Sequence, residues 1–229
     1  MHDNQEPDHE YLRANAAMLA NGSSSHNNPP QNTGEPVDES LSWQQVSQTT
    51  MTDAEYQHSL THASADQKVI IDKVFCHNRS RIVASSADQL LTGGAGVGKS
   101  FLIRTIREML IRTQQNLNSV LLTAPTGIAA YNIGGVTAHS AFCLPVEHKK
   151  TAAYVPLRAE KLKQFRMKFK DIAYVIIDEI SMLSCHNFDF INKRLCEIKD
   201  TTSDPTVIFG GLSLIVLGDL FQLKPVYGC

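Results

Sequence analysis

A glycine-rich octapeptide, GGAGVGKS at residues 93–100, carries the residue types that hold a nucleotide phosphate chain. It matches the pattern G-x-x-x-x-G-K-[ST], in which the glycines let the backbone approach the phosphates and point N–H groups at them. The lysine reaches the β- and γ-phosphates, and the last hydroxyl binds Mg²⁺. A strand pattern before the octapeptide and a helical pattern after it supply the context that this motif requires. The predicted nucleotide-binding residues are Gly93, Gly94, Ala95, Gly96, Val97, Gly98, Lys99 and Ser100, of which Lys99 is also predicted to be catalytic and Ser100 to bind the metal.

Two adjacent carboxylates, Asp178 and Glu179, end the apolar stretch IAYVIIDEIS. A buried strand that ends in such a pair brings both acids to the carboxyl edge of a sheet. Downstream of a phosphate loop, we expect Asp178 to hold Mg²⁺, directly or through water, and Glu179 to be the general base or to position the attacking water. On their own the two acids fit a solvated pair at a strand end equally well. The predicted cofactors are therefore ATP and Mg²⁺.

Apolar runs and helical periodicity alternate along the chain from about Ser64 onward. Unbroken apolar runs such as VLLTA indicate strands buried on both faces, and their alternation with helices indicates a parallel sheet. We predict an α/β domain over residues 61–229, with functional groups at the carboxyl ends of the strands. Strands are predicted within residues 87–94, 119–125, 172–181 and 212–219, and helices within residues 64–75, 99–115, 157–169 and 188–199.

Residues 1–60 differ from the rest in composition. The run NGSSSHNNPPQNTGEP consists of turn formers without apolar periodicity, and the stretch carries a net charge of −8, against +6 for the remainder. These features predict a disordered acidic tail. Trp43 is its main hydrophobic anchor and could either dock on the domain or mark a linear motif.

The composition excludes some classes of protein. No apolar run reaches the length of a membrane span, and the first residues lack the basic and apolar segments of a secretory signal. The five scattered cysteines include no C-x-x-C pair, which argues against a disulfide framework or a zinc site, so we expect a protein of a reducing intracellular compartment. A mildly basic body suits a polyanionic partner, although an ordinary surface with an acidic tail explains the charge equally well.

Two stretches allow contact with a nucleic acid. TAPTGIAAYNIGGVTAHSAF, residues 123–142, is rich in small and hydroxylated residues and offers the rings of Tyr131, His139 and Phe142 for stacking on bases. A helix N-terminus with small residues for close packing explains the same stretch equally well. Residues 148–170 carry eight bases and one acid, which fits a contact with a phosphate backbone or a solvated helix face.

Five motifs together resemble one family. GGAGVGKS, TAPTGIAA, GGVTAHSAF, IIDEISML and FGGLSLIVLGDLFQLKPV occur in the order and spacing of the Pif-one-like DNA helicases. These helicases belong to the RecD-like branch of superfamily one and include the helicase segment of Helitron transposons. The resemblance covers residues 64–228, and IIDEISML and GDLFQL are its most specific parts. It implies a P-loop NTPase fold, a RecA-like three-layer α/β domain with a mainly parallel sheet.

The resemblance also implies roles for individual residues. Gln222 corresponds to the catalytic glutamine that senses the γ-phosphate and couples it to DNA, and Lys224 follows it where the family usually has proline. Gln67 aligns with the glutamine that reads adenine, although Ser64 and Gln67 also form an S-x-x-Q capping box. The implied contacts to single-stranded DNA are Thr126, Thr137, His139 and Phe142.

The activity that the resemblance implies is ATP-dependent, 5′-to-3′ DNA unwinding in DNA repair, recombination, telomere maintenance or transposition, in the nucleus or the mitochondrion. The family completes its ATP site with a second RecA-like domain, for which no sequence follows Cys229. We therefore expect a fragment that binds nucleotide and single-stranded DNA but does not unwind alone. The alternatives are an inactive transposon-derived remnant and a P-loop ATPase that does not act on DNA.

Overall fold

The sheet that the sequence predicts is present and is wholly parallel within the described part of the chain. The computed structural model describes residues 50–80, 88–92, 98–145 and 153–219, all of which lie in Glu39–Cys229, the second of two units of the chain. The strands follow the order β1-β5-β4-β2-β3, and each neighbouring pair is parallel. They are β1 (Asp88–Thr92), β2 (Val120–Ala124), β3 (Val136–Thr137), β4 (Tyr174–Ile177) and β5 (Ser213–Gly218).

Helices connect these strands. Where the predicted helices fall among the described residues, they are confirmed, whereas the short β3 and its flanking helices were not predicted as separate elements. None of the helices in the described ranges is long and apolar enough to cross a membrane. They are α3 (Asp53–His62), α4 (Ala65–Ser80), α5 (Lys99–Gln114), α6 (Gly127–Ile133), α7 (Ala138–Phe142), α8 (Ala159–Lys168) and α9 (Cys185–Ile198), with 3₁₀ turns η2 (Ile180–Met182) and η3 (Phe209–Gly211).

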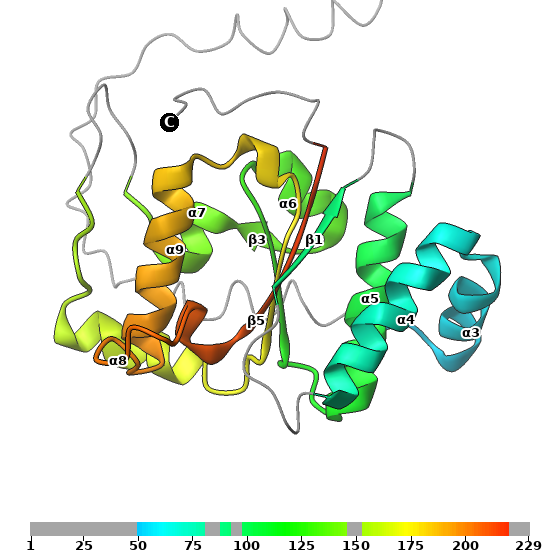
Figure 1. Ribbon diagram of the computed structural model, residues 1–229, viewed down its shortest axis with the longest axis horizontal. Helices are drawn as coiled ribbons and strands as arrows, with labels where there is room; N and C mark the ends of the chain where they lie inside the picture. The colour runs from blue at the N-terminus through cyan, green and yellow to red at the C-terminus, as the bar shows by residue number, and fades with distance from the viewer. Residues whose placement is uncertain (1–49, 81–87, 93–97, 146–152, 220–229) are drawn as a thin grey trace, which may run out of the picture. The chain divides into compact units, whose positions relative to one another are not determined.

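The sheet separates two hydrophobic layers. Successive residues of β4 point to opposite faces, so Tyr174 and Ile176 join one cluster while Val175 and Ile177 join the other. The first cluster contains side chains of α4, α5 and α6, and the second contains side chains of α7, α8 and α9. Figure 1 shows α4 and α5 on one side of the sheet and α8 and α9 on the other. Strands β2, β4 and β5 are buried on both faces, as the unbroken apolar runs predicted.

Helix α3 corrects the predicted boundary of the tail, because it lies within the stretch 1–60 that we predicted to be disordered. Its first turn has a capping box between Thr52 and Glu55. It is tied to α5 by Arg112, whose guanidinium pairs with Asp53 and donates to the carbonyl of Met51 at 2.9 Å. The composition of residues 50–60 hid this helix because its side chains are mostly polar and only Ser59 is buried.

Candidate nucleotide site

The amino end of α5 has the features of an anion-binding helix terminus. Gly98 precedes the helix with φ 80° and ψ 31°, the left-handed conformation that glycine adopts without strain. No side chain caps this end and no acidic residue lies in its first turn, so its positive end is not offset by a local carboxylate. Lys99 and Ser100 begin the helix, as the motif predicted. Residues 93–97 lie outside the described residues, so their role remains a prediction.

The two acids stand at the end of β4, as predicted. The backbone N–H of Asp178 donates to the carbonyl of Thr123 on β2 at 2.9 Å, which holds Asp178 at the carboxyl edge of the sheet. The chain then turns sharply, because Glu179 has φ 51° and ψ 46°, and its N–H donates to Oδ1 of Asp178 at 2.9 Å. A left-handed non-glycine residue is uncommon and occurs often at functional sites. This turn directs the side chains of the two acids differently.

Asp178 is a buried carboxylate, 5% exposed. Burial raises its pKa above the ordinary value, and the charge of Glu179 adds to this rise. The N–H of Glu179 and the charge of Lys99 act in the opposite direction. A buried carboxylate beside the phosphate-binding helix fits a divalent cation, because a positive charge there would offset the cost of burying the acid.

Lys99 and Glu179 meet across the site. The Nζ atom of Lys99 lies 3.9 Å from Oε1 of Glu179, and both side chains are largely buried. Lys99 comes from α5 and Glu179 from the turn after β4, so the fold joins the two halves of the predicted site. Among the described residues there is no group of three or more His, Cys, Asp or Glu side chains that could hold a metal.

Strand β5 lies between β1 and β4, so its carboxyl end stands between Thr92, the last residue of β1, and Ile177, which precedes the two acids. Its last residue, Gly218, packs closely on the turn after Glu179, because a Cβ there would lie 2.9 Å from Cγ2 of Ile180. Asp219 follows and is buried. Gln222 and Lys224 lie outside the described residues, so the predicted γ-phosphate sensor stays a prediction.

Of the two roles that the sequence left open for Gln67, the structure shows the capping box, and the contact with adenine stays a prediction. Its Oε1 accepts the backbone N–H of Ser64 at 3.0 Å, and its own N–H donates to Oγ of Ser64 at 3.2 Å, so the capping box is present. At the same time a Cβ on Gly98 would lie 2.8 Å from Nε2 of Gln67. The cap therefore holds the amide of Gln67 against the end of the phosphate loop, a position from which it could also contact a nucleotide base.

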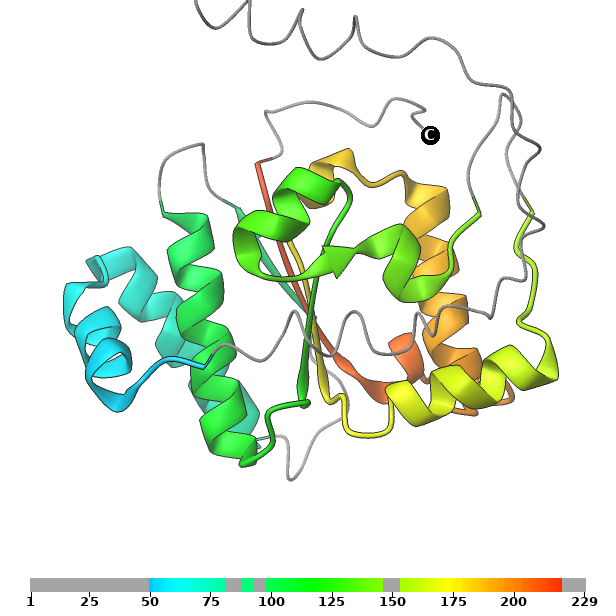
Figure 2. The ribbon, with the colours of Figure 1, turned by 180° about the vertical axis from the view of Figure 1, so that it is seen from behind.

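The predicted DNA contacts are divided between the surface and the core. Thr126 and Thr137 are the N-caps of α6 and α7 and accept the N–H groups of Ala129 at 3.2 Å and Ser140 at 3.3 Å. They follow β2 and lie on β3, which are neighbours, so both stand at the carboxyl edge of the sheet; Figure 2 shows these short green elements from behind. The helix-terminus interpretation of this stretch is therefore correct. His139 is half-buried.

Phe142 is a correction. Its side chain is fully buried and packs against Phe169, with ring centroids 6.2 Å apart, so it cannot stack on a base. It belongs to the core because α7 packs this face onto the sheet. The exposed ring of the stretch is Tyr131 on α6, which is 84% exposed. The basic stretch, by contrast, includes α8, which leads into the amino end of β4, at the opposite edge of the sheet from Asp178 (Figure 1).

The parallel sheet and the placement of Lys99, Asp178 and Glu179 define the class of protein as a RecA-like P-loop nucleotide-binding domain. A family model described as PIF1-like helicase matches residues 62–228. The chain therefore belongs to the PIF1-like helicases.

Individual relatives agree with this assignment. The chain is 36% identical over 165 residues to the ATP-dependent DNA helicase PIF7 of Trypanosoma brucei brucei, covering 71% of this chain and 15% of that protein. It is 38% identical over 140 residues to the ATP-dependent DNA helicase Pif1 of Campylobacter jejuni, covering 59% and 28%. It also resembles the crystal structure of a Bacteroides Pif1 helicase in complex with ADP-AlF3 and ssDNA, with 31% identity, a TM-score of 0.51, and coverage of 72% of this chain and 34% of that one. The chain thus spans less than a third of the length of these two curated relatives.

Proposed function

We propose that this chain is the nucleotide-binding part of an ATP-dependent DNA helicase. The observation that carries the proposal is the pairing of Lys99, at the start of the phosphate-binding helix, with Glu179 at the end of β4. Together with the buried Asp178, this arrangement provides a cation for the phosphates, an acid for the metal and an acid for water. The relatives named as ATP-dependent DNA helicases and the relative solved with ADP-AlF3 and ssDNA support the proposal.

In this proposal the chain binds and orients ATP. The N–H groups at the start of α5 and the ammonium of Lys99 hold the phosphates, while Ser100 and Asp178 would hold Mg²⁺. When bound, the metal would neutralise charge on the phosphates. Glu179, released from Lys99 when the lysine turns to the phosphates, positions or deprotonates the attacking water. Gln67 contacts the base, and Gln222 senses the γ-phosphate.

Single-stranded DNA would cross the carboxyl edge of the sheet, where the amino ends of α6 and α7 meet. Thr126, Thr137 and His139 are the proposed contacts, with Phe142 now excluded because it is buried. Ile128 is 79% exposed on α6, which leaves this edge open to a partner. In this proposal a second RecA-like domain completes the ATP site, and the helicase moves 5′ to 3′ along DNA. It acts in the nucleus or the mitochondrion, in DNA repair, recombination, telomere maintenance or transposition.

Nucleotide binding and its link to DNA test the proposal. Purified chain should bind Mg²⁺-ATP in equilibrium dialysis, and Lys99→Ala should weaken this binding by about 1.5–3 kcal/mol, roughly ten- to hundred-fold. Lys193→Ala, an exposed lysine of α9, is the matched control and should change nothing. A protein in which this chain is joined to a second RecA-like domain should hydrolyse ATP only when single-stranded DNA is added. ATP hydrolysis at the same rate with and without DNA would indicate an ATPase of another kind, and the absence of nucleotide binding would indicate an inactive remnant.

A further inference from the structure

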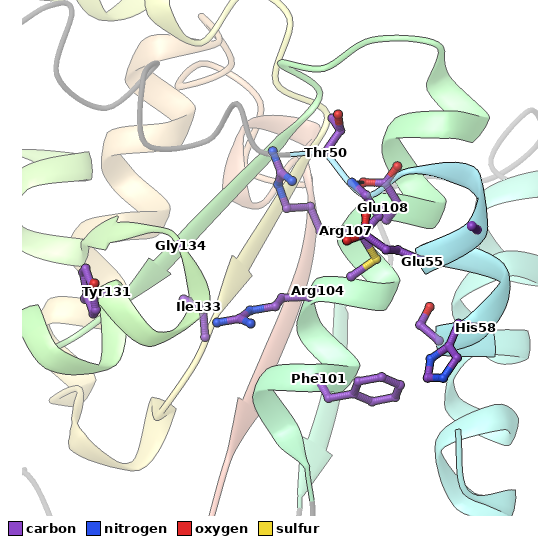
Figure 3. Close-up of a pocket in the computed structure, with 13 residues that line it drawn as sticks. Thr50, Glu55, His58, Phe101, Arg104, Arg107, Glu108, Tyr131, Ile133 and Gly134 are labelled. Atoms are coloured by element: carbon purple, nitrogen blue, oxygen red, sulfur yellow. Dashed lines mark hydrogen bonds between the residues drawn. The ribbon is translucent and has the colours of Figure 1, made fainter. Parts of the chain in front are cut away.

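A second pocket, separate from the nucleotide site, lies between α3, α5 and α6. Its volume is about 790 Å³, and none of Lys99, Ser100, Asp178 or Glu179 lines it. Figure 3 shows Thr50 and Arg107 at one end, Phe101 and His58 at the other, and Tyr131 and Ile133 across from α3. A pocket of this size is within the range that binds a large side chain or a small ligand.

Three of the charged groups that line this pocket, Glu55, Arg104 and Glu108, have hydrogen-bond partners within the domain. Glu108 accepts the N–H of Met51 at 3.1 Å and a hydrogen bond from Nε of Arg112 at 2.7 Å. The carboxylate of Glu55 takes part in the cap at Thr52. Arg104 donates to the carbonyl of Asn132 at 2.5 Å and points from α5 toward α6 (Figure 3). The pocket therefore favours an apolar occupant over a phosphate chain.

The apolar lining comes from three parts of the chain. Met51 lies before α3, Ala54 on α3, Phe101 on α5 and Ile133 on α6. Phe101 is only partly buried, so part of an aromatic face remains to be covered. A large aromatic side chain would cover more of this lining than any other residue type.

The chain itself supplies such a side chain at the right distance. Thr50 and Met51 line the pocket, and both the N–H and the carbonyl of Met51 are fixed to α5, by Glu108 and Arg112. Thr50, the first described residue, therefore lies at the rim of the pocket. Trp43, the single tryptophan of the chain, is seven residues earlier. An extended chain spans about 3.3–3.6 Å per residue, so Trp43 is within reach of every wall.

We propose that the segment 39–49 binds in this pocket and that Trp43 covers Ala54 and Phe101. The segment ESLSWQQVSQT carries only one charged residue, Glu39, and has Leu41, Trp43 and Val46 within six positions of one another, which matches a lining in which Glu55, Arg104 and Glu108 already have partners. The docked segment would extend the contact of α3 with α5, the helix that begins in the phosphate loop. This inference is independent of the proposed helicase activity.

Because Trp43 is the only tryptophan, its fluorescence in the full chain reports the proposed contact directly. In the native chain its emission should be blue-shifted, and its quenching by acrylamide several-fold weaker, relative to the chain in concentrated guanidinium chloride. Ala54→Arg places a long charged side chain in the pocket on an exposed helix position where arginine is a good helix former. This variant should shift the emission and the quenching toward the denatured values.

Gln57→Arg is the matched control, because Gln57 is exposed on the same helix and does not line the pocket. It should keep the emission and quenching of the parent chain, and thermal melts followed by circular dichroism should show both variants folded. The inference would be overturned if acrylamide quenched Trp43 equally in the native and the denatured chain, or if Trp43 were equally protected from acrylamide in Ala54→Arg and Gln57→Arg. It would also be overturned if the protection of Trp43 were lost on dilution, which would indicate that a second copy of the chain covers it. Weaker oligonucleotide binding by Ala54→Arg without any protection of Trp43 would also overturn it, and would assign the pocket to DNA.

Discussion

The ammonium of Lys99 and the carboxylate of Glu179 form an ion pair across the nucleotide site, with Nζ and Oε1 3.9 Å apart. In the proposed mechanism the lysine contacts the phosphates and the glutamate contacts water, so this pair belongs to the site before the nucleotide binds. Nucleotide binding must then break the pair. The cost is modest, because the two atoms are 3.9 Å apart, at the outer limit of an ion pair, and neither side chain is fully buried.

The pair predicts the behaviour of Glu179→Gln. Removing the carboxylate frees Lys99 for the phosphates and removes a negative charge from the site, so Mg²⁺-ATP affinity should rise a few-fold. Isothermal titration calorimetry on the purified chain measures this effect, with Glu160→Gln on the exposed α8 as the control. Weaker binding by Glu179→Gln than by the parent chain would show that the glutamate holds the nucleotide or the metal itself.

The pKa of Asp178 predicts a dependence of stability on pH. A carboxyl whose pKa is raised on folding binds its proton more tightly in the folded chain than in the unfolded chain. As pH rises from the pKa of Asp178 in the unfolded chain to its pKa in the folded chain, the free energy of unfolding therefore falls. Above the folded-chain pKa, the stability contributed by protonated Asp178 is lost completely. The parent chain should accordingly lose stability relative to Asp178→Asn as pH rises through this window, because other titrating groups cancel in the comparison. Urea unfolding of both chains across the acidic range measures the difference, and a difference that grows in the opposite direction would refute the assignment of the shift.

The backbone conformation of Gly98 predicts that a residue with a Cβ at this position destabilises the domain. Alanine there would hold a Cβ at φ 80°, which costs about 1–2 kcal/mol, and would press on the amide of Gln67. Gly98→Ala should therefore lower the free energy of unfolding by about this amount and weaken nucleotide binding. Gly127→Ala is the control, since nothing lies within 4 Å of its Cβ and its φ is negative or extended; it should be neutral or slightly stabilising. Equal effects of the two substitutions would show that the backbone at Gly98 is not constrained.

How much of this molecule the sequence predicted depends on how local each signal is. Apolar runs and the phosphate-loop pattern depend on neighbouring residues, so β1, β2, β4 and β5 and the positions of Lys99, Ser100, Asp178 and Glu179 in these elements were predicted correctly, whereas the two-residue β3 was not. Phe142 was assigned to DNA because a ring near a small-residue loop has no local mark of burial; only the packing of α7 places it in the core. Helix α3 was missed for the same reason, since its contacts with the domain include the ion pair of Asp53 with Arg112, far away along the chain. For Gln67 the sequence left two roles open, of which the structure shows the capping box, while the contact with adenine stays a prediction.

Substitutions of Phe142 and His139 should have different effects, the first on stability and the second on DNA binding. Phe142→Ala removes a fully buried ring and should cost about 3–5 kcal/mol of unfolding free energy. His139→Ala changes a half-buried side chain on the same short helix and should leave stability nearly unchanged. If His139 stacks on a base, this substitution should weaken binding of a single-stranded oligonucleotide by about 1–3 kcal/mol, measured by fluorescence anisotropy. Unchanged affinity would remove His139 from the proposed contacts.

Arg194 on α9 is a buried arginine that the sequence did not single out, and it links three parts of the chain. Its Nε donates to the carbonyl of Phe142 at 3.0 Å, its Nη2 to the carbonyl of Val155 at 3.0 Å, and its Nη1 pairs with Glu197 at 2.5 Å. Glu197 also accepts the hydroxyl of Tyr154 at 2.6 Å.

Removing one partner of such a network leaves the other charge buried. Arg194→Met should therefore lower the free energy of unfolding by about 3–5 kcal/mol, as measured by urea denaturation. Restoring charge balance tests the cause: the double variant Arg194→Met with Glu197→Gln should recover part of this loss, because no unpaired carboxylate remains. Lys193→Met, on the neighbouring exposed position, serves as the control and should cost less than about 1 kcal/mol, since its pair with Asp189 is half-exposed. If the double variant is no more stable than Arg194→Met, the loss comes from the two carbonyls that Arg194 holds at the ends of the segment between α7 and α8, and not from the charge of Glu197.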